Sequence, residues 1–65
     1  MNKKAFEKLF KENRRYSSFV IVKTLNATIY ADSYSFDKDY PKEVFLFYGT
    51  KDIGYCELNG IIEVM

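Results

Sequence analysis

The chain has 65 residues, of which 48% are hydrophobic and 18% aromatic, and its formal net charge is +1 at pH 7. A chain this short buries only about 60% of the surface that its unfolded form exposes, so we expect one domain, residues 1–65, with a small core and no deep cleft. The absence of His and the single Cys56 exclude an intrachain disulfide, a Cys/His zinc site and His-based acid–base catalysis.

The first predicted element is an amphipathic helix from about residue 3 to residue 15. Asn2 is a suitable N-cap, and Phe6, Leu9 and Phe10 share one helical face, which predicts that this face packs against the core. A basic line follows the opposite side: Lys4, Lys8, Lys11 and Arg15. This line predicts contact with nucleic-acid phosphates or an acidic protein partner, and the alternative is an ordinary solvated helix face.

From about residue 18 to residue 64 the pattern is that of short antiparallel strands. β-branched and aromatic residues predict strands at 19–24, 27–34, 43–48, 53–58 and 61–64. Asn26 predicts a left-handed turn, and Asn59-Gly60 predicts a tight hairpin between the last two strands. A helix with five short strands favours the α+β class, with an N-terminal amphipathic helix followed by a strongly bent five-stranded antiparallel sheet, a small barrel.

The second predicted strand carries a candidate protein-binding site. Tyr30, Asp32 and Tyr34 alternate with smaller residues, which predicts that two tyrosines flank a carboxylate on one face of the strand. Tyrosines are favoured anchors of protein interfaces. In the alternative interpretation they cover the open end of a small barrel and keep their hydroxyl groups in water.

The remaining apolar side chains are interpreted as structural. The predicted core comprises Phe19, Ile21, Phe45, Phe47, Leu58 and Ile62. Cys56 has no His beside it to activate its thiol, so it is expected to be a buried, inert side chain. Asp32, Asp37 and Asp39 lack the glycine and distal Glu of a calcium loop, and we expect no metal and no cofactor.

The order of elements resembles the Sm-like fold of the Hfq-type RNA chaperones and SH3-like small barrels. The segment 26–37 resembles the first Sm motif, and the segment 55–64 lies where the second motif falls. The resemblance implies a bent five-stranded barrel and RNA binding. Ala31 stands where the family has a bending glycine, and Cys56 and Glu57 stand where its RNA-contacting basic residues fall. The strand pattern is also similar to that of short uncharacterised phage proteins of low-GC bacteria.

Three hypotheses of function follow, none of them enzymatic. The first is a protein-binding module, a phage or mobile-element product that inhibits a host protein in the manner of anti-CRISPR or other anti-defence proteins. It is favoured by the small size, the many tyrosines and a composition typical of an AT-rich genome. The alternatives are an Sm-like RNA- or DNA-binding protein that uses the basic line, and a self-assembling structural subunit. We expect a cytoplasmic location and no membrane partner.

Overall fold

The computed structural model describes all 65 residues and shows an α+β protein with one helix and six strands. Helix α1 spans Lys3–Arg14, and its N-cap is confirmed as Asn2, whose Oδ1 accepts a hydrogen bond from the Ala5 amide at 2.8 Å. The strands are β1 (Val20–Thr24), β2 (Thr28–Ala31), β3 (Ser33–Ser35), β4 (Glu43–Tyr48), β5 (Lys51–Glu57) and β6 (Ile61–Val64). The helix is too short and too polar to cross a membrane.

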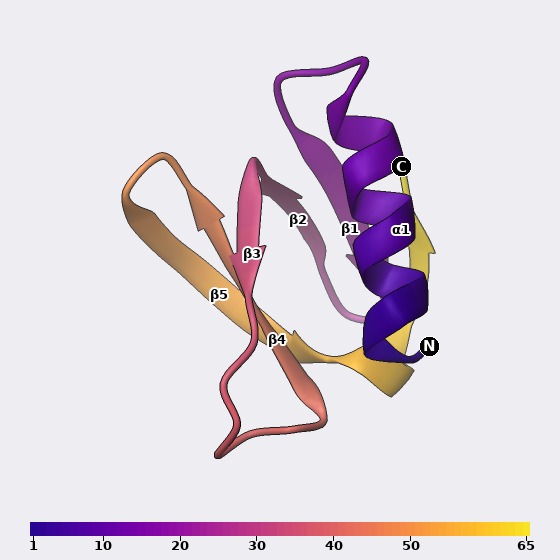
Figure 1. Ribbon diagram of the computed structural model, residues 1–65, viewed down its shortest axis with the longest axis vertical. Helices are drawn as coiled ribbons and strands as arrows, with labels where there is room; N and C mark the ends of the chain where they lie inside the picture. Colours follow the sequence, from indigo (N-terminus) through magenta and orange to yellow (C-terminus); the bar gives the residue numbers. More distant parts are fainter.

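The strands form two antiparallel sheets of three strands, ordered β2-β1-β6 and β3-β4-β5. Helix α1 lies beside β1 and β6, and β4 and β5 run on the far side of the molecule (Figure 1). The prediction of one strongly bent five-stranded sheet is therefore wrong in its detail, although the helix, the antiparallel pairing and the α+β class are confirmed. The strands do not close into a barrel.

The two sheets exist because the predicted strand 27–34 breaks at Asp32. Ala31 pairs with β1 of the first sheet, whereas Ser33 pairs with β4 of the second. The single residue between them belongs to neither strand, so the alternation of side chains shifts by one position. As a result Ala31 and Tyr34 both face the core.

The core consists of ten buried side chains supplied by the helix and both sheets. These are Phe6, Phe10, Val20, Val22, Ala31, Val44, Leu46, Leu58, Ile61 and Val64. Phe6 and Phe10 are the buried residues of α1. Burying each of these side chains contributes about 1.5–3 kcal/mol to the free energy of folding.

The predicted core is wrong at five of its six positions, and only Leu58 is buried. In β1 and β4 the alternate residues face inward, and Ile62 of β6 is 61% exposed. Positions 20–22 of β1 and 44–47 of β4 are all apolar, so within these runs the period of two cannot show which face is buried. The inward positions hold Val20, Val22, Val44 and Leu46, which are fully buried, whereas Phe45 and Phe47 lie on the opposite face of β4.

Two predicted turns also differ from the structure. Asn59-Gly60 does not make a hairpin, because β5 and β6 lie in different sheets and a short 3-10 helix, η1 (Leu58–Gly60), connects them. Asn26 is not left-handed, since positive φ angles occur only at Gly49 and Gly54. Leu58 anchors this connection: its side chain is buried in the core, and its amide donates to the Lys42 carbonyl at 2.8 Å.

Candidate functional site

The predicted site on the second strand does not form one surface. Tyr30 points outward from β2, where its side chain is 52% exposed and its ring centroid lies 5.5 Å from that of Phe19. Tyr34 points inward from β3, because the shift at Asp32 reverses its face. The structure therefore separates the two tyrosines that simple alternation had placed together.

Asp32 itself joins three parts of the fold. Its Oδ2 accepts a hydrogen bond from the Gly49 amide in the β4–β5 turn at 2.8 Å, and its Oδ1 accepts one from the Ser33 hydroxyl at 3.1 Å. Its amide donates to the Phe47 carbonyl at 2.9 Å, and its own carbonyl accepts from Arg14 Nε at 3.1 Å. The carboxylate is thus engaged in holding the corner between the sheets.

Tyr34 packs among the aromatic rings beneath the helix. Its ring centroid lies 5.4 Å from Phe6 and 4.9 Å from Phe10, both in edge-on arrangements that suit aromatic quadrupoles. Burial, with a smaller contribution from the charge of Glu7, raises the pKa of the Tyr34 hydroxyl above its ordinary value. Tyr34 is thus a neutral part of the helix–sheet contact at physiological pH.

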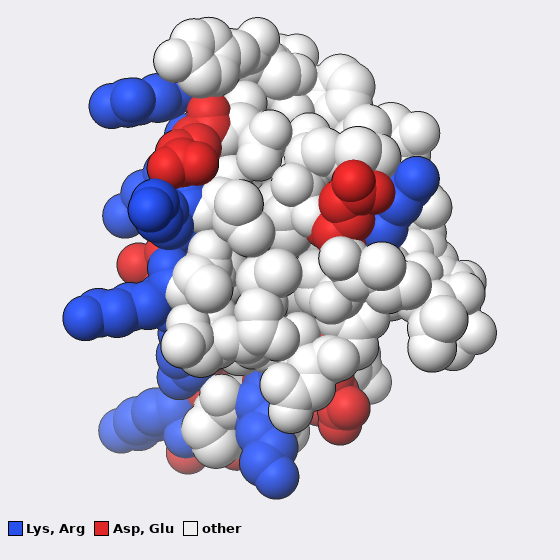
Figure 2. All heavy atoms as spheres, turned by 90° about the vertical axis from the view of Figure 1, so that its right-hand side faces the viewer, with Lys and Arg blue, Asp and Glu red and all other residues white.

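The basic line of α1 lies on the surface as predicted from its spacing. Lys4, Lys8, Lys11 and Arg15 are all exposed. Figure 2 shows Lys and Arg side chains in a column along one edge of the molecule, with a few Asp and Glu side chains between them, next to a broad face with few charges. Arg14 does not belong to this line, because its guanidinium donates to the carbonyls of Ser17 and Asp32 at 2.9 and 3.1 Å. Four cationic side chains therefore remain available to a partner.

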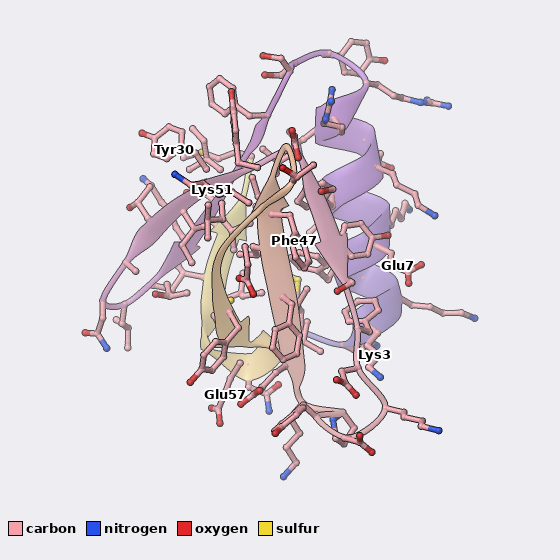
Figure 3. The ribbon with its side chains drawn as sticks, turned by 90° about the vertical axis from the view of Figure 1, so that its left-hand side faces the viewer. Lys3, Glu7, Tyr30, Phe47, Lys51 and Glu57 are labelled. Atoms are coloured by element: carbon pink, nitrogen blue, oxygen red, sulfur yellow. The ribbon has the colours of Figure 1, made fainter.

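The sequence-based prediction missed an outer aromatic face on the second sheet. We use this name for the four rings of Tyr40, Phe45, Phe47 and Tyr55. Tyr40 and Tyr55 are 53% and 63% exposed, and the two phenylalanines are half-buried. Figure 3 looks onto this side of the molecule, with Phe47 near the middle, Tyr30 and Lys51 toward one end and Glu57 at the other.

Acidic residues border this face. Glu43 pairs directly with Glu57 across β4 and β5, and Asp52 pairs with Phe47 farther along the same ladder. Like charges placed opposite each other in a sheet repel, so a cationic group beside Glu43 and Glu57 would relieve this repulsion. The end of the outer aromatic face at Glu43 and Glu57 therefore combines apolar area with negative charge, whereas Lys51 lies toward the other end (Figure 3).

Cys56 is not a reactive group in this arrangement. It lies half-buried on the inward face of β5 opposite Val44, and burial raises the pKa of its thiol above its ordinary value. Since the thiolate is the nucleophile, the thiol is poorly reactive at neutral pH. The structure also brings together no group of three or more His, Cys, Asp or Glu side chains that could hold a metal ion.

Comparison with known proteins finds no matching family model, no similar curated protein and no similar solved structure. The evidence on function is therefore the geometry of the chain itself. Two surfaces stand out, the outer aromatic face on the second sheet and the basic line on α1.

We predict that Asp32→Ala lowers the free energy of unfolding by about 0.5–1.5 kcal/mol, because the Gly49 amide and the Ser33 hydroxyl lose their acceptor at a corner that is open to water. The measurement is equilibrium unfolding in urea. Asp39→Ala is the matched control, since Asp39 is exposed in the loop before β4, and it should leave the midpoint unchanged. An equal loss in both variants would show that the corner does not depend on this carboxylate.

Proposed function

We propose that the protein is a non-catalytic protein-binding module that contacts its partner through the outer aromatic face. The observation that carries the proposal is the presence of three aromatic rings of β4 and β5 on one side of the second sheet, with Tyr40 of the preceding loop packed on Phe45. Tyr40 and Tyr55 are more than half exposed. Contiguous exposed apolar surface is unusual on a small monomeric protein and marks interaction sites. Tyr is also among the residues that contribute most to binding energy in protein interfaces.

The module needs no chemistry of its own. The chain contains no His, and the raised pKa of Cys56 keeps its thiol protonated, so the side chains at hand favour binding over catalysis. The small size and the AT-rich composition support the further step of the proposal, in which the module is a phage or mobile-element product that occupies a host protein. Within the previously predicted site, Tyr30 is the residue whose exposed ring could add to such an interface.

The proposal predicts that Phe47→Ser/Tyr55→Ser abolishes partner binding while the protein stays folded, because both rings project from the sheet and neither belongs to the core. Tagged wild-type protein is used for affinity capture from a low-GC bacterial lysate, and the captured protein is then purified and titrated by calorimetry. Circular dichroism confirms the fold of each variant. A single partner at a near-equal amount is expected with the wild type.

The matched control is Tyr16→Ser/Leu25→Ser, which also removes two large exposed apolar side chains, each 87% exposed, but away from the second sheet. This control variant should bind the partner as tightly as the wild type does. If both double variants bind equally well, or if only the control loses binding, the outer aromatic face is not the interface.

A second candidate function is nucleic-acid binding in the manner of an Sm-like protein, favoured by the four exposed cations of the basic line. In this case binding to single-stranded RNA or DNA should weaken steeply with salt, since each phosphate contact releases a counterion. Lys8→Gln/Lys11→Gln should reduce the slope of log affinity against log salt by about 1.4, at about 0.7 per contact for single strands. The measurement is fluorescence anisotropy with a labelled oligonucleotide.

The two candidate functions predict different effects of the two double variants on oligonucleotide binding. Affinity for the oligonucleotide that is lost in Phe47→Ser/Tyr55→Ser but kept in Lys8→Gln/Lys11→Gln contradicts the basic-line proposal. No retention of the oligonucleotide at low salt contradicts nucleic-acid binding altogether. A self-assembling subunit, the third hypothesis, stays a prediction that sedimentation of the isolated protein would test.

A further inference from the structure

A pocket lies beside β4 on the second sheet. It has a volume of about 260 Å³ and is lined by Tyr40, Glu43, Phe45 and Tyr55. Three of its four lining residues are aromatic, the fourth is a carboxylate, and no basic residue lines it. It occupies the end of the outer aromatic face where Glu43 and Glu57 stand opposite each other.

The three rings form a floor and a wall. Phe45 and Tyr55 are directly paired across β4 and β5, with ring centroids 5.7 Å apart and planes inclined at 33°, so they lie side by side as a floor. The ring of Tyr40 lies 6.0 Å from Phe45 at 70° and forms the wall. A flat group can therefore lie on the floor with its edge toward Glu43.

The wall is held in place by the backbone of the loop. The Tyr40 amide donates to the Asp37 carbonyl at 3.0 Å, and the Glu43 amide donates to the Tyr40 carbonyl at 3.1 Å. The Asp37 side chain accepts a further bond from the Asp39 amide at 2.9 Å. Successive turns thus position Tyr40 before any ligand arrives, which lowers the entropic cost of binding.

The chemistry of this pocket selects a cation. The faces of aromatic rings are electronegative and attract cationic groups within about 6 Å of the ring centroid. Glu43 adds a full negative charge, and its repulsion with Glu57 is relieved when a positive group enters. A neutral or anionic ligand would gain neither effect.

We propose that this pocket binds an arginine side chain of the partner protein, with the guanidinium stacked on the floor of Phe45 and Tyr55 and its N–H groups donating to Glu43. Arginine fits better than lysine because its guanidinium is planar, stacks on aromatic rings and presents a fork of donors that matches a carboxylate. The inference rests on the proposed function, because it names the residue of the partner that the outer aromatic face recognises.

The test uses the full chain labelled with ¹⁵N and a capped five-residue peptide with one arginine between glycines, followed by heteronuclear NMR. The control peptide carries citrulline, which has the same shape but no charge, and a third peptide carries lysine. The arginine peptide should give saturable shifts at the amides around Phe45 and Tyr55. The citrulline peptide should bind at least about twofold more weakly, since a cation–π contact at an exposed site accounts for about two- to fivefold and the ion pair adds to it.

Variants test the assigned contacts. Glu43→Gln and Tyr55→Ala should each weaken binding of the arginine peptide, whereas the matched changes Glu63→Gln and Tyr16→Ala, at exposed positions away from the pocket, should not. Equal shifts with arginine and citrulline, tighter binding of the lysine peptide, or shifts that leave the pocket residues unmoved would each overturn the assignment.

Failure here is distinguishable from failure of the proposed function. If Glu43→Gln binds the captured partner as tightly as the wild type does, while Phe47→Ser/Tyr55→Ser does not bind it, the outer aromatic face is the interface and the arginine assignment alone is wrong. If neither change affects the partner, the proposed interface is wrong as well.

Discussion

The fold depends on the break in the chain at Asp32. An uninterrupted strand from Thr28 to Ser35 would keep Tyr30 and Tyr34 on the same face. The helix would then lose the contacts of Phe6 and Phe10 with the Tyr34 ring. Because of the break, the chain leaves the first sheet at Ala31 and enters the second sheet at Ser33. The corner is held because the Asp32 carboxylate accepts hydrogen bonds from Gly49 and Ser33 while its amide pairs with Phe47.

This corner also divides the aromatic residues between two roles. Phe6, Phe10 and Tyr34 pack against one another between the helix and the sheets, where the edge-on contacts of Tyr34 with both phenylalanines supplement a small core. The rings of Phe45 and Tyr55 are left on the outside of the second sheet. A chain of this size has too little interior for all of its rings, so the ones that stay outside become a surface available for binding.

The charged side chains are also divided between the helix and the second sheet. The helix carries an exposed basic line on one side of the molecule, and acidic residues border the outer aromatic face on β4 and β5 (Figures 2 and 3). The two surfaces therefore suit partners of opposite charge. For the outer aromatic face, a positively charged partner gains both from the carboxylates and from the ring faces, which is the physical basis of the proposed function.

The sequence predicted the elements whose patterns are unambiguous. The helix, its Asn2 cap and the strand from Glu43 to Tyr48 follow directly from periodicity and capping chemistry. The inward face of that strand could not be predicted, because Val44 and Leu46 alternate with Phe45 and Phe47 and every position is apolar. The break at Asp32 was hidden for another reason: its bonds are to Gly49 and Phe47, which are distant in sequence.

The candidate site was missed as a consequence of these two errors. Assigning Phe45 and Phe47 to the core removed the rings that form the outer aromatic face, and assigning Tyr34 to the surface placed an interface where the structure has packing. One signal in the sequence was available, since Tyr40 and Tyr55 lie near β4 with acidic neighbours. A tyrosine ring has an apolar body and a hydroxyl group that favours water, so such residues often lie at the surface. The basic line on α1 needed only helical spacing and was placed correctly on the surface.

The most direct test of this account is the set of proton–proton contacts made by the Tyr34 ring in a nuclear Overhauser spectrum of the intact protein. The account predicts strong cross-peaks from the Tyr34 ring to the rings of Phe6 and Phe10, and none to the ring of Tyr30. Cross-peaks between Tyr34 and Tyr30, with none to the helix, would show that the strand continues unbroken through Asp32 and would contradict the assignment of both faces.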